Sequence, residues 1–321
     1  MLNARLIRWL VIGALAAATA VCLWVGIRTP RTAQPRITVA QATVLGLVEG
    51  LTEYVPVSST GHLILAGHYM GLNQIGEHGL LGPKIRSTAA VSAFEVVIQL
   101  GAIIAVAGLY RRRVGEMVLG AVGRNPRGRR LLINLLIAVA PAIVIGGLFA
   151  KPIQEHLFNP VMVAIALVAG GAAMIAAEWW HRRKMSGKRE PDILHITYWQ
   201  ALVIGLAQCL AMWPGTSRSM ITIVAALMVG MNMVAAAEFS FLLALPTLGA
   251  ATVYELAKNW SGLFSSCEPA ALAVGLVVSA VSAAVAVTAL VQWLTKHGLW
   301  PFGIYRIILG AAVYAYFMIR F

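Results

Sequence analysis

Charged side chains are scarce in this chain of 321 residues. Only 12% of the residues are Asp, Glu, Lys or Arg, against about 25% in soluble domains. Apolar residues reach 60%, against roughly 45–50% in such domains. This composition excludes an ordinary water-soluble enzyme, and it also excludes a disordered chain, a coiled coil or a collagen. The mean hydropathy of +0.80, with apolar runs of about 20 residues, instead predicts a bundle of transmembrane helices.

Cysteine and acidic residues are also few. Of the three cysteines, Cys22 and Cys209 lie in apolar segments and only Cys267 lies in a connection, so no disulfide framework is expected. The 25 basic residues exceed the 12 acidic ones and give a formal net charge of +13. The basic residues cluster in short connections between apolar runs, which is typical of orientation signals in membrane proteins. We therefore predict a membrane partner and no nucleic-acid partner.

Apolar runs bounded by Arg, Pro or polar clusters predict the membrane helices. They lie at about 9–27, 40–55, 59–71, 90–110, 131–150, 160–180, 195–212, 217–230, 233–257, 270–294 and 301–320. The stretches 40–71 and 195–230 are each broken by a run rich in Pro, Ser and Thr, and each half is short for a membrane span. We predict that each stretch forms a re-entrant hairpin of two broken helices.

The basic connections predict the topology. Arginines and lysines concentrate in two loops, within 111–130 and 182–189, and two helices separate these loops, so both loops are expected on the cytoplasmic side. The first hairpin then enters from the outer side and the second from the cytoplasm. The fold class predicted is an all-α polytopic bundle with two inverted-topology repeats, at about 40–180 and 195–320. Sites in such folds lie near the midplane, where the broken helices meet.

Residues 1–37 precede these repeats and form an N-terminal extension. Its apolar stretch 9–27 follows Arg5 and Arg8, so it is either an extra membrane helix or a signal-like segment. Its length favours a retained helix. Residues 38–321 are expected to form one integral membrane domain.

Two carboxylates fall on one face of the first broken helix. Glu49 and Glu53 are four residues apart, and such a pair inside a membrane needs a cation or a shared proton. The alternative is a surface pair on an interfacial helix. Glu95, Glu178 and Glu238 stand singly on other helices, where hydrogen bonding between helices is the expected role. Glu95 and Glu238 remain candidates for supporting the site from behind its ligands.

Hydroxyl groups mark the break in each hairpin. In the first hairpin Ser58, Ser59 and Thr60 follow Pro56, and in the second a similar run contains an arginine. That second run comprises Pro214, Gly215, Thr216, Ser217, Arg218 and Ser219. One hydroxyl would suffice to cap a helix, which is the simpler interpretation. If the two tips meet, two helix N-termini converge and form a site for phosphate.

Arg218 and His62 complete the cluster. An arginine at the tip of a broken membrane helix must be paired, either with phosphate oxygens or with Glu49 or Glu53 in an ion pair. His62 lies one turn beyond Ser58, where it is either structural or a proton donor to a leaving group. Together these groups indicate a metal-assisted phosphoryl site, although the sequence contains neither a P-loop nor an HExxH motif.

Two long runs in these hairpins resemble the signature motifs of the undecaprenyl-diphosphatase family, the bacitracin-resistance membrane phosphatases of bacteria. They are EGLTEYVPVSSTGH at 49–62 and PGTSRSMIT at 214–222. The resemblance extends to 94–101, 238–243 and 305–310, and covers the chain from about residue 38 to its end.

The resemblance implies an enzymatic activity and a cellular location. Members hydrolyse undecaprenyl diphosphate to the monophosphate with a divalent cation, at the outer face of the bacterial cytoplasmic (inner) membrane, and so recycle the lipid carrier of cell-wall synthesis. It implies that Glu49 and Glu53 bind the metal, that Glu53, Ser59 and His62 are catalytic, and that Arg218 binds the diphosphate.

The mechanism expected is attack by Ser59 on the terminal phosphate. Mg²⁺ or Ca²⁺ suits the oxygen ligands of Glu49 and Glu53. The phosphate-binding groups expected are Ser58, Thr60, Thr216, Ser217, Arg218 and Ser219. The alternative nucleophiles are a water molecule activated by Glu53 and the His62 side chain. A transporter or flippase of polyprenyl phosphate is the main rival function, and a protein that only binds such a lipid is a third. The sequence leaves open whether two copies form a homodimer.

Overall fold

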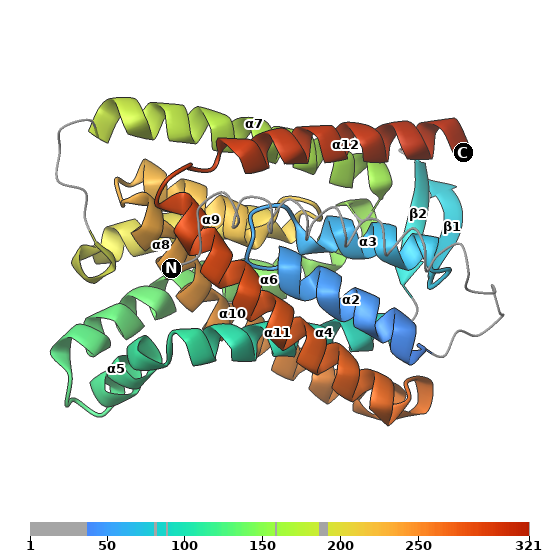
Figure 1. Cartoon of the computed structure of the whole chain (residues 1–321), viewed down its shortest axis with the longest axis horizontal. Coiled ribbons are helices and arrows are strands. Elements are labelled where there is room, and N and C mark those ends of the chain that lie inside the picture. Colours follow the sequence, from blue (N-terminus) through green and yellow to red (C-terminus); the bar gives the residue numbers. More distant parts are fainter. Residues whose placement is uncertain (1–36, 80–81, 88, 158, 186–191, 321) are drawn as a thin grey trace.

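The structure is a computed structural model that describes residues 37–79, 82–87, 89–157, 159–185 and 192–320. The stretch 9–27, for which an additional membrane helix was predicted, lies outside the described residues. Within them the fold is a bundle of α-helices with one two-stranded hairpin (Figure 1). The all-α prediction therefore holds for this part of the chain, with the strand pair as an exception.

The first half of the chain contains α2 Val39–Thr52, α3 Ser59–Tyr69, β1 Asn73–Gly79, β2 Gly82–Ser87, α4 Ala89–Leu109, α5 Arg111–Ala121, α6 Pro126–Leu157 and α7 Pro160–Met185. The second half contains the 3₁₀ turn η1 Ile193–His195, α8 Tyr198–Gln208, the 3₁₀ turn η2 Cys209–Met212, α9 Arg218–Met228, α10 Met233–Ser266, α11 Pro269–Leu294 and α12 Trp300–Arg320.

Five helices in the described chain are long and apolar enough to cross a membrane. They are Val91–Leu109, Pro126–Phe149, Pro160–Met185, Met233–Glu255 and Pro269–Leu294. The helices α2, α8 and α9 are apolar but shorter than a span. The chain is thus a multi-pass membrane protein that also contains short apolar helices, as the interrupted stretches predicted.

Glycines allow the helices around the short ones to approach closely. A Cβ atom on Gly46 of α2 would lie 2.5 Å from the carbonyl oxygen of Gly275 on α11. One on Gly171 of α7 would lie 2.5 Å from the carbonyl oxygen of Gly303 on α12. Small residues at helix contacts are typical of membrane bundles, where close backbone approach replaces the hydrophobic effect. These contacts fix α2 against α11, and α12 along α7.

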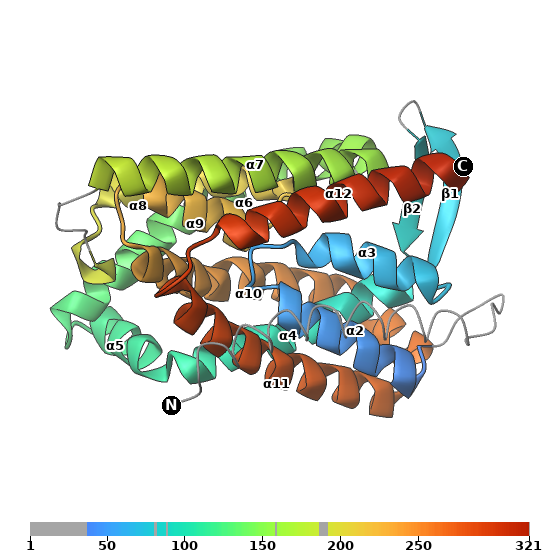
Figure 2. The ribbon, with the colours of Figure 1, turned by 45° about the horizontal axis from the view of Figure 1, so that its top comes forward.

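The two pairs of short helices lie in opposite halves of the bundle. Both views place α2 and α3 in the half that carries β1 and β2, and α8 and α9 in the half that carries α5 (Figures 1 and 2). The break between α2 and α3 faces the middle of the bundle, as does the break between α8 and α9. The two breaks, which we call the first and second tips, are residues 53–58 and 213–217.

Two connections differ from the sequence prediction. The stretch 111–130 was predicted as a basic loop, but it contains α5 and the first turns of α6. Met117 and Gly120 of α5 are buried, whereas Arg111 and Arg112 are exposed, so the segment forms a helix with one buried face. Between the predicted helices 59–71 and 90–110 no element was expected, but the structure has the antiparallel strands β1 and β2 there.

Candidate active site at the two helix tips

Each tip ends in a serine that caps the next helix. Ser58 and Ser217 are the two non-glycine residues with a positive φ in the described chain, at 77° and 71°. Their side-chain oxygens accept hydrogen bonds from the backbone N–H groups of Gly61 and Met220, at 3.3 Å in both cases. Non-glycine residues adopt this conformation rarely and at a cost of order 1–3 kcal/mol, and such strain clusters at functional sites. The two tips therefore share one unusual local geometry.

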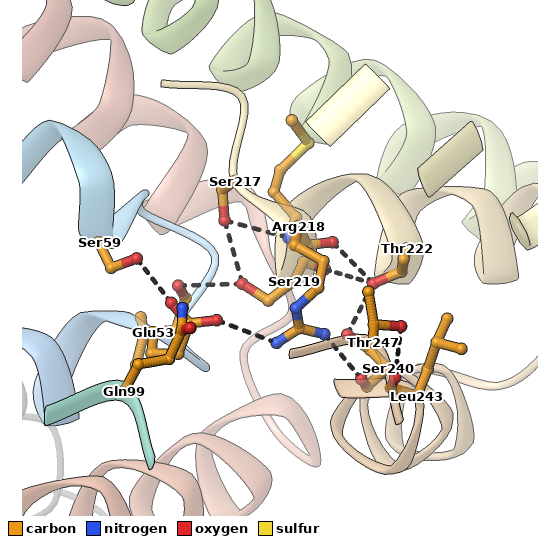
Figure 3. Close-up of polar contacts among 12 residues, drawn as sticks. Glu53, Ser59, Gln99, Ser217, Arg218, Ser219, Thr222, Ser240, Leu243 and Thr247 are labelled. Carbon is orange, nitrogen blue, oxygen red and sulfur yellow. Dashed lines mark hydrogen bonds and ion pairs between the residues drawn. The ribbon is translucent and has the colours of Figure 1, made fainter. Parts of the chain in front are cut away.

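The first residues of the two capped helices meet on one carboxylate. Ser59 begins α3 and Arg218 begins α9, so they occupy equivalent positions. Ser59 Oγ donates a hydrogen bond to Glu53 Oε2 at 2.6 Å, and Arg218 Nη2 lies 3.3 Å from Glu53 Oε1. Figure 3 shows the two side chains reaching the two oxygens of Glu53. Glu53 is buried, and it terminates α2 at the start of the first tip.

Further contacts hold Arg218 and the second tip in place. Arg218 Nη1 donates to the carbonyl oxygen of Ser240 on α10 at 2.9 Å, while its Nε atom is buried and has no partner. The Ser240 hydroxyl is 2.7 Å from that of Thr222 on α9. Ser219 Oγ donates across the gap between the tips to the carbonyl oxygen of Val55 at 3.2 Å (Figure 3). Arg218 thus retains a donor that a bound anion could use.

Glu49 lies one helical turn before Glu53, and only 2% of its surface is exposed. Its Oε2 atom is buried without a hydrogen-bond partner. The charged groups that act on it are Glu53, Glu95 and Arg218. A buried carboxylate oxygen without a partner, beside a second carboxylate, is a donor set that suits a hard cation. In the described residues no three acidic, His or Cys side chains form a ready-made metal cluster. Two carboxylates are the number of protein ligands that Mg²⁺ commonly takes, since it keeps several of its other ligands as water or phosphate.

His62 is held by two hydrogen bonds. Its Nδ1 atom donates to the carbonyl oxygen of Ser58 at 2.7 Å, and its Nε2 atom is 2.7 Å from the hydroxyl of Tyr305 on α12. Because a carbonyl only accepts, the proton of the neutral ring is on Nδ1, and Nε2 accepts from Tyr305. His62 therefore contacts the backbone of the first tip, immediately before Ser59.

The structure brings three of the predicted catalytic side chains, Glu53, Ser59 and Arg218, into direct contact. The ion pair between Arg218 and Glu53, which the sequence left as the alternative to phosphate binding, is present. Among the predicted phosphate-binding residues, Ser58 and Ser217 act as caps, and the Ser217 and Ser219 hydroxyls lie 3.0 Å apart.

The two threonines at the tips are placed differently. Thr60 is exposed on the first turn of α3. Thr216 contributes its backbone carbonyl oxygen, which accepts from Arg306 at 3.0 Å.

Sequence reasoning did not assign roles to two residues of α12. Tyr305 bonds His62, and Arg306 bonds backbone atoms of both tips. The available signal was an arginine within the apolar stretch 301–320, since a cation inside a membrane span needs partners. The sequence could not show which partners those are.

Of the isolated acidic residues, Glu178 and Glu238 connect helices, as predicted, whereas Glu95 lies close enough to Glu49 to act on its charge. Glu178 accepts from the backbone N–H groups of Leu299 and Trp300 at 2.6 and 2.7 Å, and so caps the start of α12. Glu238 accepts from Arg113 Nε at 3.0 Å. Neither residue contacts Glu53, so they stand apart from the tips.

A carboxylate that holds a serine hydroxyl and an arginine between two helix N-termini, inside a multi-pass bundle, is typical of a membrane protein that acts on phosphate groups. Comparisons with known proteins agree with this class. The family model described as "Bacitracin resistance protein BacA" matches residues 42–312, and the chain belongs to that family.

Its relatives include proteins named undecaprenyl-diphosphatase. The one from Sorangium cellulosum is 46% identical over 273 residues, which cover 85% of this chain and 84% of that protein. Undecaprenyl-diphosphatase 2 of Rhodospirillum rubrum is 44% identical over 86% of this chain and 93% of its own length. The protein from Acinetobacter baumannii strain AYE is 42% identical over 86% and 94%. The resemblance found in the sequence is thus confirmed.

Proposed function

We propose that this chain hydrolyses undecaprenyl diphosphate to undecaprenyl phosphate and inorganic phosphate. The activity would recycle the lipid carrier of cell-wall synthesis and confer resistance to bacitracin. Membership of the bacitracin-resistance family and relatives that bear the name undecaprenyl-diphosphatase support this activity. The observation that carries the assignment is the shared carboxylate of Glu53, with Ser59 on one oxygen and Arg218 on the other.

In this proposal Ser59 is the nucleophile. Its hydroxyl already donates to Glu53 Oε2 at 2.6 Å, so Glu53 is placed to take the proton as Ser59 Oγ bonds to the terminal phosphorus. The anhydride bond breaks, and the lipid leaves as undecaprenyl phosphate. Water then releases inorganic phosphate from Ser59 and restores its hydroxyl. This geometry favours Ser59 over His62, because both ring nitrogens of His62 are already bonded.

Arg218 and the backbone N–H groups that begin α3 and α9 hold the phosphate oxygens. Arg218 supplies its free Nε donor, and its other donors turn from Glu53 and Ser240 to phosphate as the substrate enters. The first turns of α3 and α9 supply backbone N–H groups, with the hydroxyls of Ser217 and Ser219 beside them. Two converging helix N-termini provide more stabilisation for an anion than either tip alone.

Glu49 and Glu53 would hold a divalent cation, Mg²⁺ or Ca²⁺. The unpartnered Oε2 of Glu49 supports this assignment. When bound, the cation would neutralise charge on the diphosphate. His62 would donate a proton to the leaving oxygen only from its imidazolium form, in which Nε2 carries a second proton taken from water and the Tyr305 hydroxyl no longer donates to it.

We infer that α2–α3 and α8–α9 are re-entrant hairpins of two inverted repeats, within a single domain that spans 38–321. Their placement in opposite halves of the bundle supports this (Figure 2). The shared geometry of Ser58 and Ser217 supports it as well. The arginines around α5 mark the cytoplasmic end, so the site opens to the outer side of the bacterial cytoplasmic membrane.

Thiol labelling tests this orientation. We expect Lys84→Cys in β2 to react with an impermeant maleimide in intact cells, and Arg124→Cys beyond α5 to react only after permeabilisation. The native Cys22, Cys209 and Cys267 are first replaced, since Cys209 and Cys267 are free thiols. If only Arg124→Cys were labelled in intact cells, the orientation would be the opposite of the one inferred, and the site would open to the cytoplasm.

One reconstitution experiment distinguishes hydrolysis from the rival function, transport of polyprenyl phosphate. Purified protein in lipid vesicles receives undecaprenyl diphosphate, and inorganic phosphate and lipid monophosphate are measured together. We expect the two to appear in equal amounts. Movement of a fluorescent polyprenyl phosphate across the bilayer without phosphate release would indicate a transporter instead. Binding without either outcome would indicate a protein that only binds the lipid.

A further inference from the structure

A buried arginine on α12 joins the two tips. Arg306 has no exposed surface, and no carboxylate pairs with it among the described residues. Its guanidinium donates instead to backbone carbonyl oxygens. Nη1 reaches Pro56 at 3.4 Å, and Nη2 reaches Gly215 at 2.9 Å and Thr216 at 3.0 Å. A further bond from Nη2 to Ala166 of α7, at 3.1 Å, anchors the group to the surrounding bundle.

These carbonyl groups come from the turns that present the catalytic side chains. Pro56 lies three residues before Ser59, and Gly215 and Thr216 lie two to three residues before Arg218. One rigid, planar group is therefore bonded to both tips. The separation of the tips, in turn, decides whether Ser59 and Arg218 can both reach Glu53.

The bundle provides a dedicated space for this guanidinium. A Cβ atom on Gly170 of α7 would lie 2.3 Å from Arg306 Nη2 and 3.0 Å from its Cζ atom. The neighbouring Tyr305 is hydrogen-bonded to His62, which contacts the first tip, and Arg306 bonds the tip at Pro56. Two consecutive residues of α12 therefore stabilise the first tip. Burying a cation without a carboxylate is unfavourable, and an apolar side chain would fill the same volume at a lower cost. Packing alone therefore does not explain why an arginine occupies position 306.

We propose that Arg306 is a positioning residue for hydrolysis, which fixes the two tips so that Ser59 and Arg218 act on one diphosphate. The proposal rests on the proposed function. Arg306 touches neither the substrate nor the reacting atoms. It acts through the backbone of the tips, because a displacement of about 1 Å between reacting groups can lower a rate about 100-fold.

The test compares kcat and KM of purified variants for undecaprenyl diphosphate, on protein that elutes as a single species. We expect Arg306→Met to lower kcat about 100-fold while KM changes less than about threefold, since Arg218 and the cation that Glu49 would hold still bind the substrate. Arg306→Lys keeps the positive charge but replaces the planar guanidinium, which donates to both tips, with a single ammonium group. An intermediate loss of kcat is therefore expected. Gly170→Ala, which displaces the guanidinium without removing it, should lower kcat about tenfold.

Arg113→Met is the matched control. Arg113 is also an arginine that bonds another helix, through Glu238, but it lies away from the tips. We expect this variant to lose thermal stability and to keep kcat within about twofold. A purely structural role for Arg306 would give the same pattern in Arg306→Met, and that result would overturn the proposal. A rise in KM with unchanged kcat would also overturn it, because Arg306 would then act on binding.

Two outcomes separate this proposal from the proposed function. If the wild-type protein releases no phosphate, the function itself is wrong. If the wild-type protein is active and the Arg306 variants retain its kcat, only the positioning role is wrong. If Arg306→Met does not fold, the test depends on Arg306→Lys and Gly170→Ala. An unchanged kcat in both of these variants would refute the positioning role of Arg306.

Discussion

Glu53→Gln is expected to lower kcat for phosphate release by about 1,000-fold. Glutamine keeps the shape of the side chain, but its amide cannot take the proton of Ser59 and carries no charge for Arg218 or a cation. General-base catalysis alone contributes about 100- to 10,000-fold, so the loss of this one carboxylate suffices. The measurement is the initial rate of phosphate release by purified protein at saturating undecaprenyl diphosphate.

Glu178→Gln is the control for Glu53→Gln. Glu178 is also a buried carboxylate, but its Oε2 atom caps α12, its Oε1 atom pairs with Arg182, and neither oxygen contacts a tip. We expect this variant to melt at a lower temperature and to keep kcat within about threefold, because a capping interaction contributes about 1 kcal/mol to stability. Equal losses of activity in the two variants would indicate a folding effect and remove the assignment of Glu53.

Ser59→Ala has the second large effect, a loss of about 1,000-fold or more in kcat, because the nucleophile is removed. The substitution leaves the helix cap intact, since Ser58 and not Ser59 caps α3. Ser282→Ala is the matched control, as Ser282 is a buried serine on α11 that bonds helix carbonyl groups and lies outside the tips. The control should retain activity within about threefold.

The same variant distinguishes the alternative nucleophiles. If water activated by Glu53 attacks the phosphate, Ser59→Ala retains a substantial rate, within about tenfold of the wild type. Phosphate trapped on Ser59 in acid-quenched wild-type protein, and missing from Ser59→Ala, would support the covalent route. Phosphate on His62 in both proteins, trapped by an alkaline quench because phosphohistidine is labile in acid, would contradict it.

The meeting of the two tips could be predicted from the sequence because its causes are local. Proline ends a helix, and serines next to it start another, so both breaks are visible in the chain. Aligned on their prolines, the two runs pair Ser58 and Ser59 with Thr216 and Ser217. In the structure Ser58 and Ser217 are instead the equivalent caps, so Ser59 corresponds to Arg218, and both of these residues contact Glu53.

The role of Arg306 could not be predicted in this way. Its partners are carbonyl oxygens at Pro56 and Gly215, which lie 250 and 91 residues away in the chain. Backbone carbonyls carry no sequence signature, so no pattern identifies them as ligands. His62 illustrates the same limit, because its distance from Ser58 along the helix was readable but its bond to Tyr305 depends on how α12 packs.

The basic stretch 111–130 was misread for a different reason. Seven arginines among its 20 residues obscured the buried face of α5, which consists of Met117 and Gly120. A Cβ atom on Gly120 would lie 2.2 Å from the backbone nitrogen of Arg129, so the two segments pack by backbone contact. Such packing depends on small residues rather than on a conspicuous apolar stripe.

Metal dependence of phosphate release tests the central claim, that Glu49 and Glu53 form a cation-assisted phosphatase site with Ser59 and Arg218. Purified wild-type protein is assayed at saturating undecaprenyl diphosphate after treatment with a chelator, and Mg²⁺ or Ca²⁺ is then titrated back. We expect phosphate release to cease in the chelator and to return with the cation. Glu49→Gln should need at least about tenfold more cation for half-maximal release, since even outer-shell changes weaken metal binding about 10- to 100-fold. Full phosphate release in the presence of the chelator would contradict the claim.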